Sequence, residues 1–532
     1  MIRSDFPKPQ SRSLRWFDAI VLVFIALLGA IHLPYPLGDD QALFTLGAQK
    51  MSQGAVLYKD FYDVKQPGIF FFYLTAGRLF GFHEIGSHAL DALYILLFSV
   101  VLIFTLKRYF TREYLPALTA LLYSGFYYAA PGREHSTQFF GQVEGLAGLP
   151  LFLAAWCAWV AVRAQANRHA SRVFGGMFCS GVAGGIALVL KLMFLPILVS
   201  LWLFTIAWML RNRLGPIRAL LSVCCASLLA GLLVAPTATA LYFARTGDLW
   251  PLIYTSFVFP LTAAREAAPG SRTGQLIVGL QWFLTWASPL LALALIGGWV
   301  ATRRSYSFLG IAMVLWMMTG FVVIFLQFLS WWPYHYLLLL TPMSVLAANG
   351  IDIIFQYLRG QPEISEKSGP AHGVRLAAVG SLALLFSPVG TCWAIDGLFL
   401  AHHRFALTKA DRTSFQGKID PNYAKSVREC EFLSETDSLP GDIFVAGHYI
   451  YYTISGRNQA IAMNGESADE LLPGAWKEIH QQLAVKLPPY IFIAADASTM
   501  PAMTNSGLPE LLEAKYKALR HSDAGTWYQI KP

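Results

Sequence analysis

The sequence predicts a mostly α-helical, polytopic membrane protein with about eleven transmembrane helices and a small C-terminal α/β domain. The 532-residue chain is 55% hydrophobic and only 14% charged, whereas soluble globular proteins carry about 25% charged residues. Long apolar runs recur through residues 1–400, and their lengths match the ~20 residues that a helix needs to cross a bilayer. Basic residues gather in alternate connections between these runs, which is the charge pattern that orients membrane helices.

Eleven apolar runs are long enough to be membrane spans, with boundaries that vary by several residues. We favour an uncleaved first span over a secretory signal, because "GAIHLPYP" offers no small-residue cleavage pattern. The predicted spans lie at roughly 17–36, 88–106, 114–130, 144–162, 173–190, 192–210, 218–243, 277–301, 308–329, 334–357 and 376–400. The glycines of "GVAGGIALVL" predict a close contact between two of these helices.

The charges of the turns predict the orientation of the spans. The turns "KRYFTRE", "RAQANRHASR", "RNRLGPIR", "TRRS" and "RGQPEISEKSGPAHGVR" each carry two or three Lys or Arg residues. The turns "PGREHSTQFFGQ" and "QFLSWWPYHY" on the other side carry one and none. Basic turns stay in the cytoplasm, so we expect a cytoplasmic N-terminus. An odd number of spans then places the C-terminal segment on the outer face.

Two outside loops interrupt the predicted transmembrane domain of residues 1–400. The loop 37–87 contains "DQALFTLGAQKMSQG" and "PGIFFFYLTAGRLFG", which predict two helices lying on the membrane surface with one apolar side. A short span or a re-entrant segment is the alternative for the second of these helices. The other outside loop covers residues 244–276.

Residues 401–532 predict a small soluble α/β domain. The β-like runs "DIFVAG" (442–447), "PYIFIAA" (489–495) and "TWYQI" (526–530) alternate with the helix-like "GAWKEIHQQLAVKL" and "LPELLEAKYKAL". This alternation is typical of a three-stranded α/β unit.

Several classes of function are disfavoured. The net charge is +8, but residues 401–532 hold 13 Lys and Arg against 15 Asp and Glu, so the basic excess belongs to the membrane turns and does not indicate a nucleic-acid partner. The six cysteines show no C-x-x-C or Cys/His ligand spacing, which argues against a disulfide framework or a zinc site. Neither a phosphate-binding loop nor a dinucleotide-binding fingerprint is present. An activated lipid is therefore the natural energy source for any transfer reaction.

Two adjacent carboxylates, Asp39 and Asp40, follow the first apolar run directly. The nearby "YKDFYDVKQPG" adds Asp63 and Lys65. A carboxylate at an apolar–aqueous boundary can act as general base toward a hydroxyl group, and a lysine is a compact cation suited to a phosphate. Either acid taken alone could equally be a solvated loop residue.

The stretch from "GDDQALF" to "ALYILLF" resembles the first outside loop and second span of the GT-C glycosyltransferases. It is most similar to the protein O-mannosyltransferase and aminoarabinose transferase branch (family 39, RgtA/B/C/D-like). Those proteins show an acid, a helix ending near a glycine, a "Y…D…KPP" turn and an "LFG" before the next span. Later "WWPYHYLLLLTPMSVLAANG" and "GDIFVAGHYIYYTISGR" are also similar to this family.

The resemblance implies a role for each matching residue. Counting back from Gly54 places the family's catalytic aspartate on Asp40, with Asp39 beside it, and the family lysine on Lys65. The chain departs from the family pattern at two positions, where Gln41 replaces a frequent glutamate and Gln66 replaces the first proline of the turn.

The activity implied is an inverting transfer of a sugar from a polyprenyl-phosphate donor to a hydroxyl of a lipid, glycan or protein acceptor. Asp40 would deprotonate the acceptor while Lys65 holds the departing phosphate. No cofactor is implied, although Asp39 beside Asp40 leaves a divalent metal open. The implied location is a bacterial inner membrane, with the active site and the C-terminus in the periplasm.

Supporting site residues are expected at the outer ends of the spans and in the outer loops. Their alternatives are anchoring in an aromatic belt or a solvated turn. Lys191, at the outer end of a span, is expected to snorkel to the surface unless it is paired. The candidates for the donor phosphate are His335, Tyr334, Arg265 and Arg272, and those for the acceptor or for supporting contacts are Arg133, Glu134, His135 and Asp63.

A transporter or flippase of a lipid-linked or anionic substrate is the rival interpretation. Transporters place their charged groups near the middle of the bilayer, whereas the charges of this chain gather at one face. The distribution therefore favours chemistry at the membrane surface.

Overall fold

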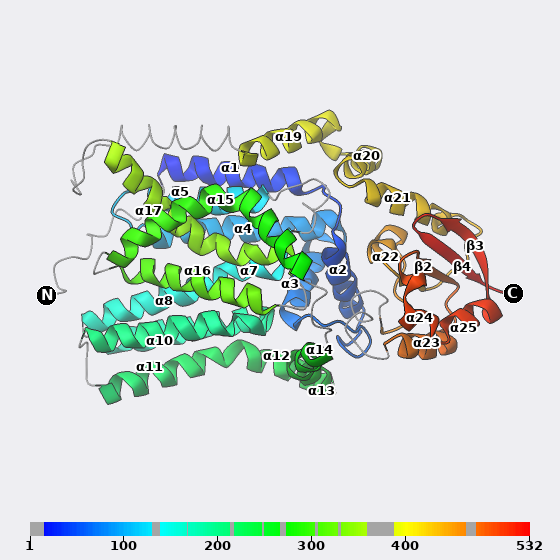
Figure 1. Cartoon of the computed structure of the whole chain (residues 1–532), viewed down its shortest axis with the longest axis horizontal. Helices are drawn as coiled ribbons and strands as arrows, with labels where there is room; N and C mark the ends of the chain where they lie inside the picture. The colour runs from blue at the N-terminus through cyan, green and yellow to red at the C-terminus, as the bar shows by residue number, and fades with distance from the viewer. Residues whose placement is uncertain are drawn as a thin grey trace. The chain divides into compact units, whose positions relative to one another are not determined.

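The computed structural model describes residues 15–129, 139–167, 169–212, 217–246, 249–266, 273–303, 307–327, 331–358, 388–463 and 475–532 (Figure 1). These residues belong to two compact units. The first unit comprises Met1–Leu33, Asp91–Thr239 and Gly270–His402. The second comprises Pro34–Leu90, Ala240–Pro269 and His403–Pro532, and its three segments overlap the two outside loops and the C-terminal segment of the sequence analysis.

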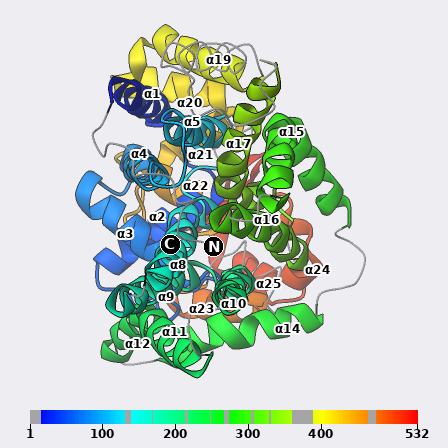
Figure 2. The same cartoon turned by 90° about the vertical axis from the view of Figure 1, so that its left-hand side faces the viewer.

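The first unit is helical throughout the part that the structure describes. Helices α8, α10 and α16 run side by side in Figure 1, and Figure 2 views them nearly end on. Helix α4 begins in the second unit and continues in the first, and helix α12 begins in the first unit and ends in the second. The elements are α1 (Trp16–His32), α4 (Glu84–Leu106), α5 (Leu115–Tyr128), α7 (Val143–Leu146), α8 (Gly148–Ala166), α9 (Ala170–Leu190), η1 (Leu192–Phe194), α10 (Leu195–Arg211), α11 (Ile217–Leu232), α12 (Val234–Arg245), α15 (Thr273–Arg303), α16 (Phe308–Leu326), η3 (Pro333–Leu339), α17 (Leu340–Leu358) and α19 (Pro388–His402).

Eight helices within the described ranges are long and apolar enough to cross a membrane, which makes the chain a multi-pass membrane protein. They correspond to eight of the eleven predicted spans. Of the other three, α1 has 17 residues and α5 has 14, and the run 376–400 is described only from Pro388. The mostly helical fold class is confirmed.

Helices α9 and α11 pack closely, as the glycine pattern predicts. A Cβ atom on Gly181 would lie 2.2 Å from the carbonyl oxygen of Leu228, and one on Gly231 would lie 2.1 Å from that of Phe178. Only a residue without a side chain fits such distances, because the two backbones touch.

The second unit contains the remaining elements. The bounds of its helices and strands are α2 (Asp39–Ser52), α3 (Pro67–Phe80), α13 (Trp250–Ile253), the π-helix η2 (Tyr254–Val258), α14 (Phe259–Glu266), η4 (Arg404–Ala406), α20 (Lys409–Ile419), α21 (Pro421–Cys430), η5 (Glu431–Ser434), β1 (Ile443–Ala446), α22 (Ile450–Ser455), α23 (Ala475–Lys486), β2 (Tyr490–Ala494), η6 (Ala497–Thr499), α24 (Pro501–Thr504), α25 (Leu508–Lys515), β3 (Tyr516–Ser522) and β4 (Gly525–Ile530).

The C-terminal segment folds around a four-stranded sheet of order β1-β2-β4-β3. Strands β1 and β2 are parallel, and β4 runs antiparallel to both of its neighbours. The prediction of three strands is wrong, because the end of the helix-like "LPELLEAKYKAL" forms β3. Helix α25 stops at Lys515, and the next residue, Tyr516, pairs with Ile530 of β4. Pairing with β4 thus outweighs the local helical pattern.

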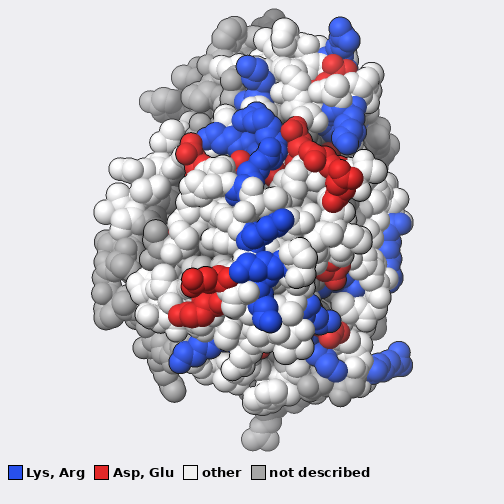
Figure 3. Space-filling view, turned by 90° about the vertical axis from the view of Figure 1, so that its right-hand side faces the viewer, with Lys and Arg blue, Asp and Glu red and all other residues white. Residues whose placement is uncertain are grey.

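Basic and acidic side chains are intermingled on the face shown in Figure 3. The C-terminal segment contributes near-equal numbers of both signs, with 13 basic and 15 acidic residues. Such a mixture is typical of a surface in contact with water.

Helix α2 is buried largely against other parts of the protein. Nine of its fourteen residues are buried, and it packs against α3. A Cβ atom on Gly47 would lie 2.7 Å from the rings of Phe61 and Phe70, so the helix is held by protein side chains. This packing determines where the first turn of α2 presents its acids.

Candidate functional site

Asp39 and Asp40 are the first two residues of helix α2. The extended Gly38 precedes them, and its N–H donates to Oε1 of Gln41 at 2.9 Å. Gln41, which departs from the family pattern, therefore closes the start of the helix as a cap. The first turn of a helix carries unpaired backbone N–H groups, which stabilise negative charge there.

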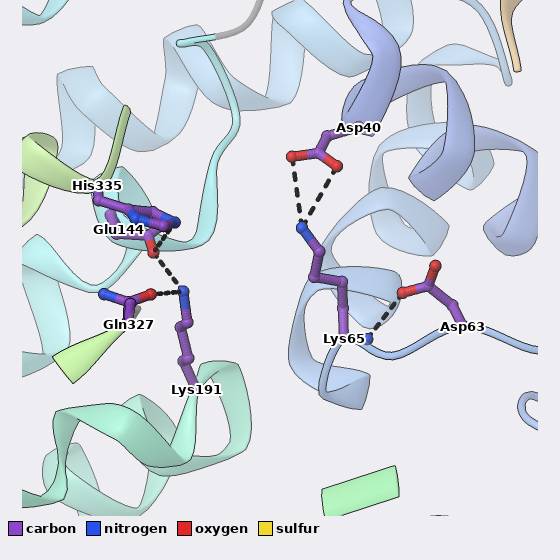
Figure 4. Close-up of polar contacts among 7 residues, drawn as sticks. All are labelled: Asp40, Asp63, Lys65, Glu144, Lys191, Gln327 and His335. Carbon is purple, nitrogen blue, oxygen red and sulfur yellow. Dashed lines mark hydrogen bonds and ion pairs between the residues drawn. The ribbon is translucent and has the colours of Figure 1, made fainter. Parts of the chain in front are cut away.

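Asp40 faces Lys65 across the loop that follows α2. The Lys65 Nζ atom lies 3.3 Å and 3.4 Å from the two carboxylate oxygens of Asp40 (Figure 4). The two side chains are 27% and 23% exposed, respectively. The ring of Phe44 lies 5.7 Å from the same Nζ atom. A carboxylate and an amine are thus brought together beside an apolar wall.

The turn that carries Lys65 is fixed through its backbone. The Lys65 N–H donates to Oδ1 of buried Asp63 at 2.7 Å, and the Tyr58 hydroxyl donates to the Lys65 carbonyl at 2.6 Å. Asp63 and Tyr58 therefore hold the backbone of this turn, and the Lys65 side chain extends from the turn to Asp40.

Asp39 contacts Nε2 of His448 in the C-terminal segment. Burial raises the pKa of the Asp39 carboxyl above its usual value, the His448 imidazole lowers it, and the neighbouring Asp40 carboxylate raises it again. The two adjacent acids consequently have separate partners within the second unit.

A second charged cluster lies within the first unit. Lys191, which caps α9, donates to Glu144 at 2.6 Å and to the side-chain oxygen of Gln327 at 2.5 Å (Figure 4). The His335 Nε2 atom lies 3.7 Å from the same Glu144 oxygen. Glu144 is 1% exposed and His335 2%. Lys191 is thus paired with a buried carboxylate, which is the alternative to snorkelling that the sequence analysis left open.

The predicted site residues fall into three groups. Asp39, Asp40, Asp63 and Lys65 gather in the second unit, and Arg265 lies in its helix α14. His335 and Tyr334 are buried in the first unit. The remaining candidates, Arg133, Glu134, His135 and Arg272, lie outside the described residues.

The sequence analysis missed two charged contacts, at Glu144 and at His448. Glu144 is the first residue of a predicted span. Because an acidic side chain in an apolar run is costly unless it is paired, its pairing with Lys191 could have been proposed. His448 carries no such signal, because its partner Asp39 is distant in the sequence. In the described part of the chain, no three His, Cys, Asp or Glu side chains are grouped as a metal site.

Comparison with known proteins identifies the fold. No family profile and no curated protein sequence matches the chain. Among solved structures, it is similar to ArnT from Cupriavidus metallidurans bound to undecaprenyl phosphate, at 15% identity and a TM-score of 0.59, over 96% of this chain and 97% of ArnT. The apo state of ArnT gives 14% identity and a TM-score of 0.56 over 96% of each chain.

A more distant similarity extends to an oligosaccharyltransferase. The archaeal enzyme AglB from Archaeoglobus fulgidus, in complex with an inhibitory peptide and a dolichol-phosphate, matches at 13% identity and a TM-score of 0.50. The match covers 97% of this chain and 74% of AglB. Both neighbours are glycosyltransferases of the GT-C type, so this chain has the GT-C glycosyltransferase fold.

Proposed function

We propose that this protein is an inverting glycosyltransferase of a bacterial inner membrane. It moves a sugar from a polyprenyl-phosphate donor to a hydroxyl group of a lipid, glycan or protein acceptor on the periplasmic side. The contact between Asp40 and Lys65 carries this proposal, because it joins a base and a phosphate-binding cation in a fold whose solved members include one bound to undecaprenyl phosphate.

The transfer follows from the chemistry of these two side chains. Asp40 accepts the proton of the acceptor hydroxyl as its oxygen attacks the anomeric carbon of the sugar. The bond between that carbon and the phosphate oxygen breaks, and the lipid phosphate leaves with the electron pair. Lys65 stabilises the charge of that phosphate. A single displacement of this kind inverts the anomeric configuration.

The resting ion pair sets the order of events. Asp40 and Lys65 neutralise each other in the structure, so the base is engaged before the donor arrives. A lipid phosphate that binds the Lys65 amine displaces the Asp40 carboxylate from it. The carboxylate is then free to accept a proton from the acceptor hydroxyl. A phosphate is already a stabilised anion, and the proposed transfer requires no metal.

The test is transfer by purified protein in detergent, given radiolabelled polyprenyl-phosphate sugars and candidate acceptors. We expect Asp40→Asn to abolish transfer while the protein still folds. Full transfer by Asp40→Asn with none by Asp39→Asn would assign the base to the other acid. If neither substitution impairs transfer, this site is not the catalytic one, and lipid-flipping assays in vesicles would test the transporter interpretation.

A further inference from the structure

The C-terminal segment contacts helix α2 at both of its ends. At the N-terminal end, His448 meets Asp39. At the C-terminal end, the Lys50 Nζ atom donates to the carbonyl oxygen of Gln459 at 2.6 Å. Just beyond the helix, the Tyr62 N–H donates to the carbonyl oxygen of Ala462 at 2.9 Å. The helix that presents the proposed base is therefore held by a part of the chain that is distant in sequence.

The turn that carries His448 is rigid. It connects β1 to α22, and its Gly447 has a φ of 147°, where a Cβ atom would lie 2.8 Å from that of Ala494. The Tyr452 hydroxyl accepts a hydrogen bond from the N–H of Val445 in β1 at 2.8 Å. Strand and helix are thus linked on either side of the turn, which fixes the position of the imidazole.

The hydrogen bonds of the imidazole define its tautomer. The N–H of Ile450 donates to Nδ1 of His448 at 3.2 Å, so Nδ1 is an acceptor and the proton of the neutral ring lies on Nε2. Nε2 is the nitrogen that meets Asp39. In this neutral tautomer the ring is oriented as a hydrogen-bond donor to the Asp39 carboxylate.

Asp39 and Asp40 are like charges on one helical turn, and each raises the free energy of the other's ionised form. The Nε2–H of His448 is directed at the Asp39 carboxylate, and the Lys65 amine is paired with Asp40. When a donor phosphate binds Lys65, the contact between His448 and Asp39 remains in the first turn of α2, beside the Gln41 cap.

We propose that His448 is a positioning residue for the general base: by holding Asp39, it fixes the first turn of α2 so that Asp40 points at the acceptor hydroxyl. The inference rests on the proposed function and gives the C-terminal domain a part in catalysis. His448 touches neither the sugar nor the phosphate in this scheme, and it acts through Asp39.

The experiment measures kcat and the donor KM for the full-length protein and its His448 variants. His448→Ala should lower kcat by up to about 100-fold, which is the cost of misplacing a catalytic group by about 1 Å, and should leave the donor KM nearly unchanged. His448→Gln places an amide N–H near the position of Nε2 and should restore most of the lost kcat. Asp39→Ala should lower kcat as His448→Ala does, and the double variant should be no slower than either single variant.

A matched control separates positioning from docking of the domain. Lys50→Met removes a contact between the same two segments at the far end of α2, away from the acids, and should leave kcat unchanged. The thermal unfolding midpoint of every variant shows whether it is folded. If His448→Ala does not fold, kcat and the donor KM are compared for His448→Gln and Asp39→Asn instead.

Three results would overturn the inference: wild-type kcat in His448→Ala, equal losses in His448→Ala and Lys50→Met, or additive losses in the double variant. Asp40→Asn is assayed beside them. Full transfer by Asp40→Asn refutes the role of Asp40 as the base, on which this inference rests, whereas an inactive Asp40→Asn with a fully active His448→Ala refutes only the role of His448.

Discussion

The two ion pairs of Figure 4 have similar chemistry and different surroundings. In the second unit, Lys65 and Asp40 are each about a quarter exposed and lie 3.3 Å apart at their closest atoms. In the first unit, Lys191 and Glu144 lie 2.6 Å apart, and the glutamate is 1% exposed. The Lys191 amine also donates to Gln327. The contact between Asp40 and Lys65 is longer than that between Glu144 and Lys191, and it is partly open to solvent.

The difference between these pairs predicts different roles. A partly exposed ion pair contributes about 0–1 kcal/mol to stability, so Lys65 and Asp40 can separate when a ligand arrives. Removing one partner of a buried pair costs about 3–5 kcal/mol, because the other charge is left without compensation. Together with Gln327, the Lys191–Glu144 pair connects α7, α9 and α16 of the first unit. The comparison predicts that catalysis depends on the open pair and stability on the buried one.

The largest expected effect is that of Asp40→Asn on transfer. An amide cannot accept the acceptor proton, and general-base catalysis contributes about 10²- to 10⁴-fold to a rate. We expect kcat to fall by that factor in the donor–acceptor assay. The unfolding midpoint should stay close to that of the wild type, because an exposed pair contributes little. An Asp40→Asn protein that is inactive and also has a clearly lower unfolding midpoint would contradict this prediction, because the exposed pair would then contribute to stability as the buried pair does.

Lys191→Met should reduce stability more than any substitution in the open pair. The loss leaves the Glu144 carboxylate buried without its cation, and we expect the free energy of unfolding to fall by about 3–5 kcal/mol. Chemical denaturation in detergent micelles measures this change.

A double variant provides the control for Lys191. Glu144→Leu combined with Lys191→Met removes both charges, and replacing a whole buried pair by apolar groups is often neutral. The double variant should be more stable than Lys191→Met alone. Equal destabilisation in both would show that the packing of the lysine stem matters, and not the uncompensated charge.

Lys65→Ala should change donor binding more than stability. The substitution removes the cation proposed for the phosphate, so the donor KM should rise about tenfold, the loss of about 1.4 kcal/mol that one charge-assisted contact supplies. The unfolding midpoint should not change measurably. Donor titrations at fixed acceptor concentration measure the KM, and an unchanged value would contradict the phosphate role.

The helical fold was largely predictable, because the length of an apolar run is a local signal. Eight predicted spans correspond to helices that meet the length and composition of a span. Two features depended on distant parts of the chain and were not predictable. Strand β3 forms by pairing with β4, and α2 is buried by α3 and by the aromatic rings of Phe61 and Phe70.

The candidate site was predictable only where a short sequence distance or a family pattern connects its members. Asp40 and Lys65 were selected together by resemblance, and the structure brings their side chains into contact. Glu144 and Lys191 come from different helices, and their pairing is a product of the helix packing. His448 belongs to a turn of the C-terminal domain, whose position beside Asp39 follows from the fold of the whole second unit.

Ionic strength provides the smallest effect and the least invasive test of the comparison. Raising the salt concentration from about 0.1 M to about 1 M shortens the Debye length from about 10 Å to about 3 Å. The attraction between exposed Lys65 and a donor phosphate should weaken, and the donor KM of the wild-type protein should rise a few-fold. Lys65→Ala lacks this attraction and should respond less. The Glu144 carboxylate is buried at 1% exposure, so its interaction with Lys191 should be less screened by salt, and the unfolding midpoint should not follow the KM. An equal salt response in the wild type and in Lys65→Ala would mean that another cation binds the phosphate.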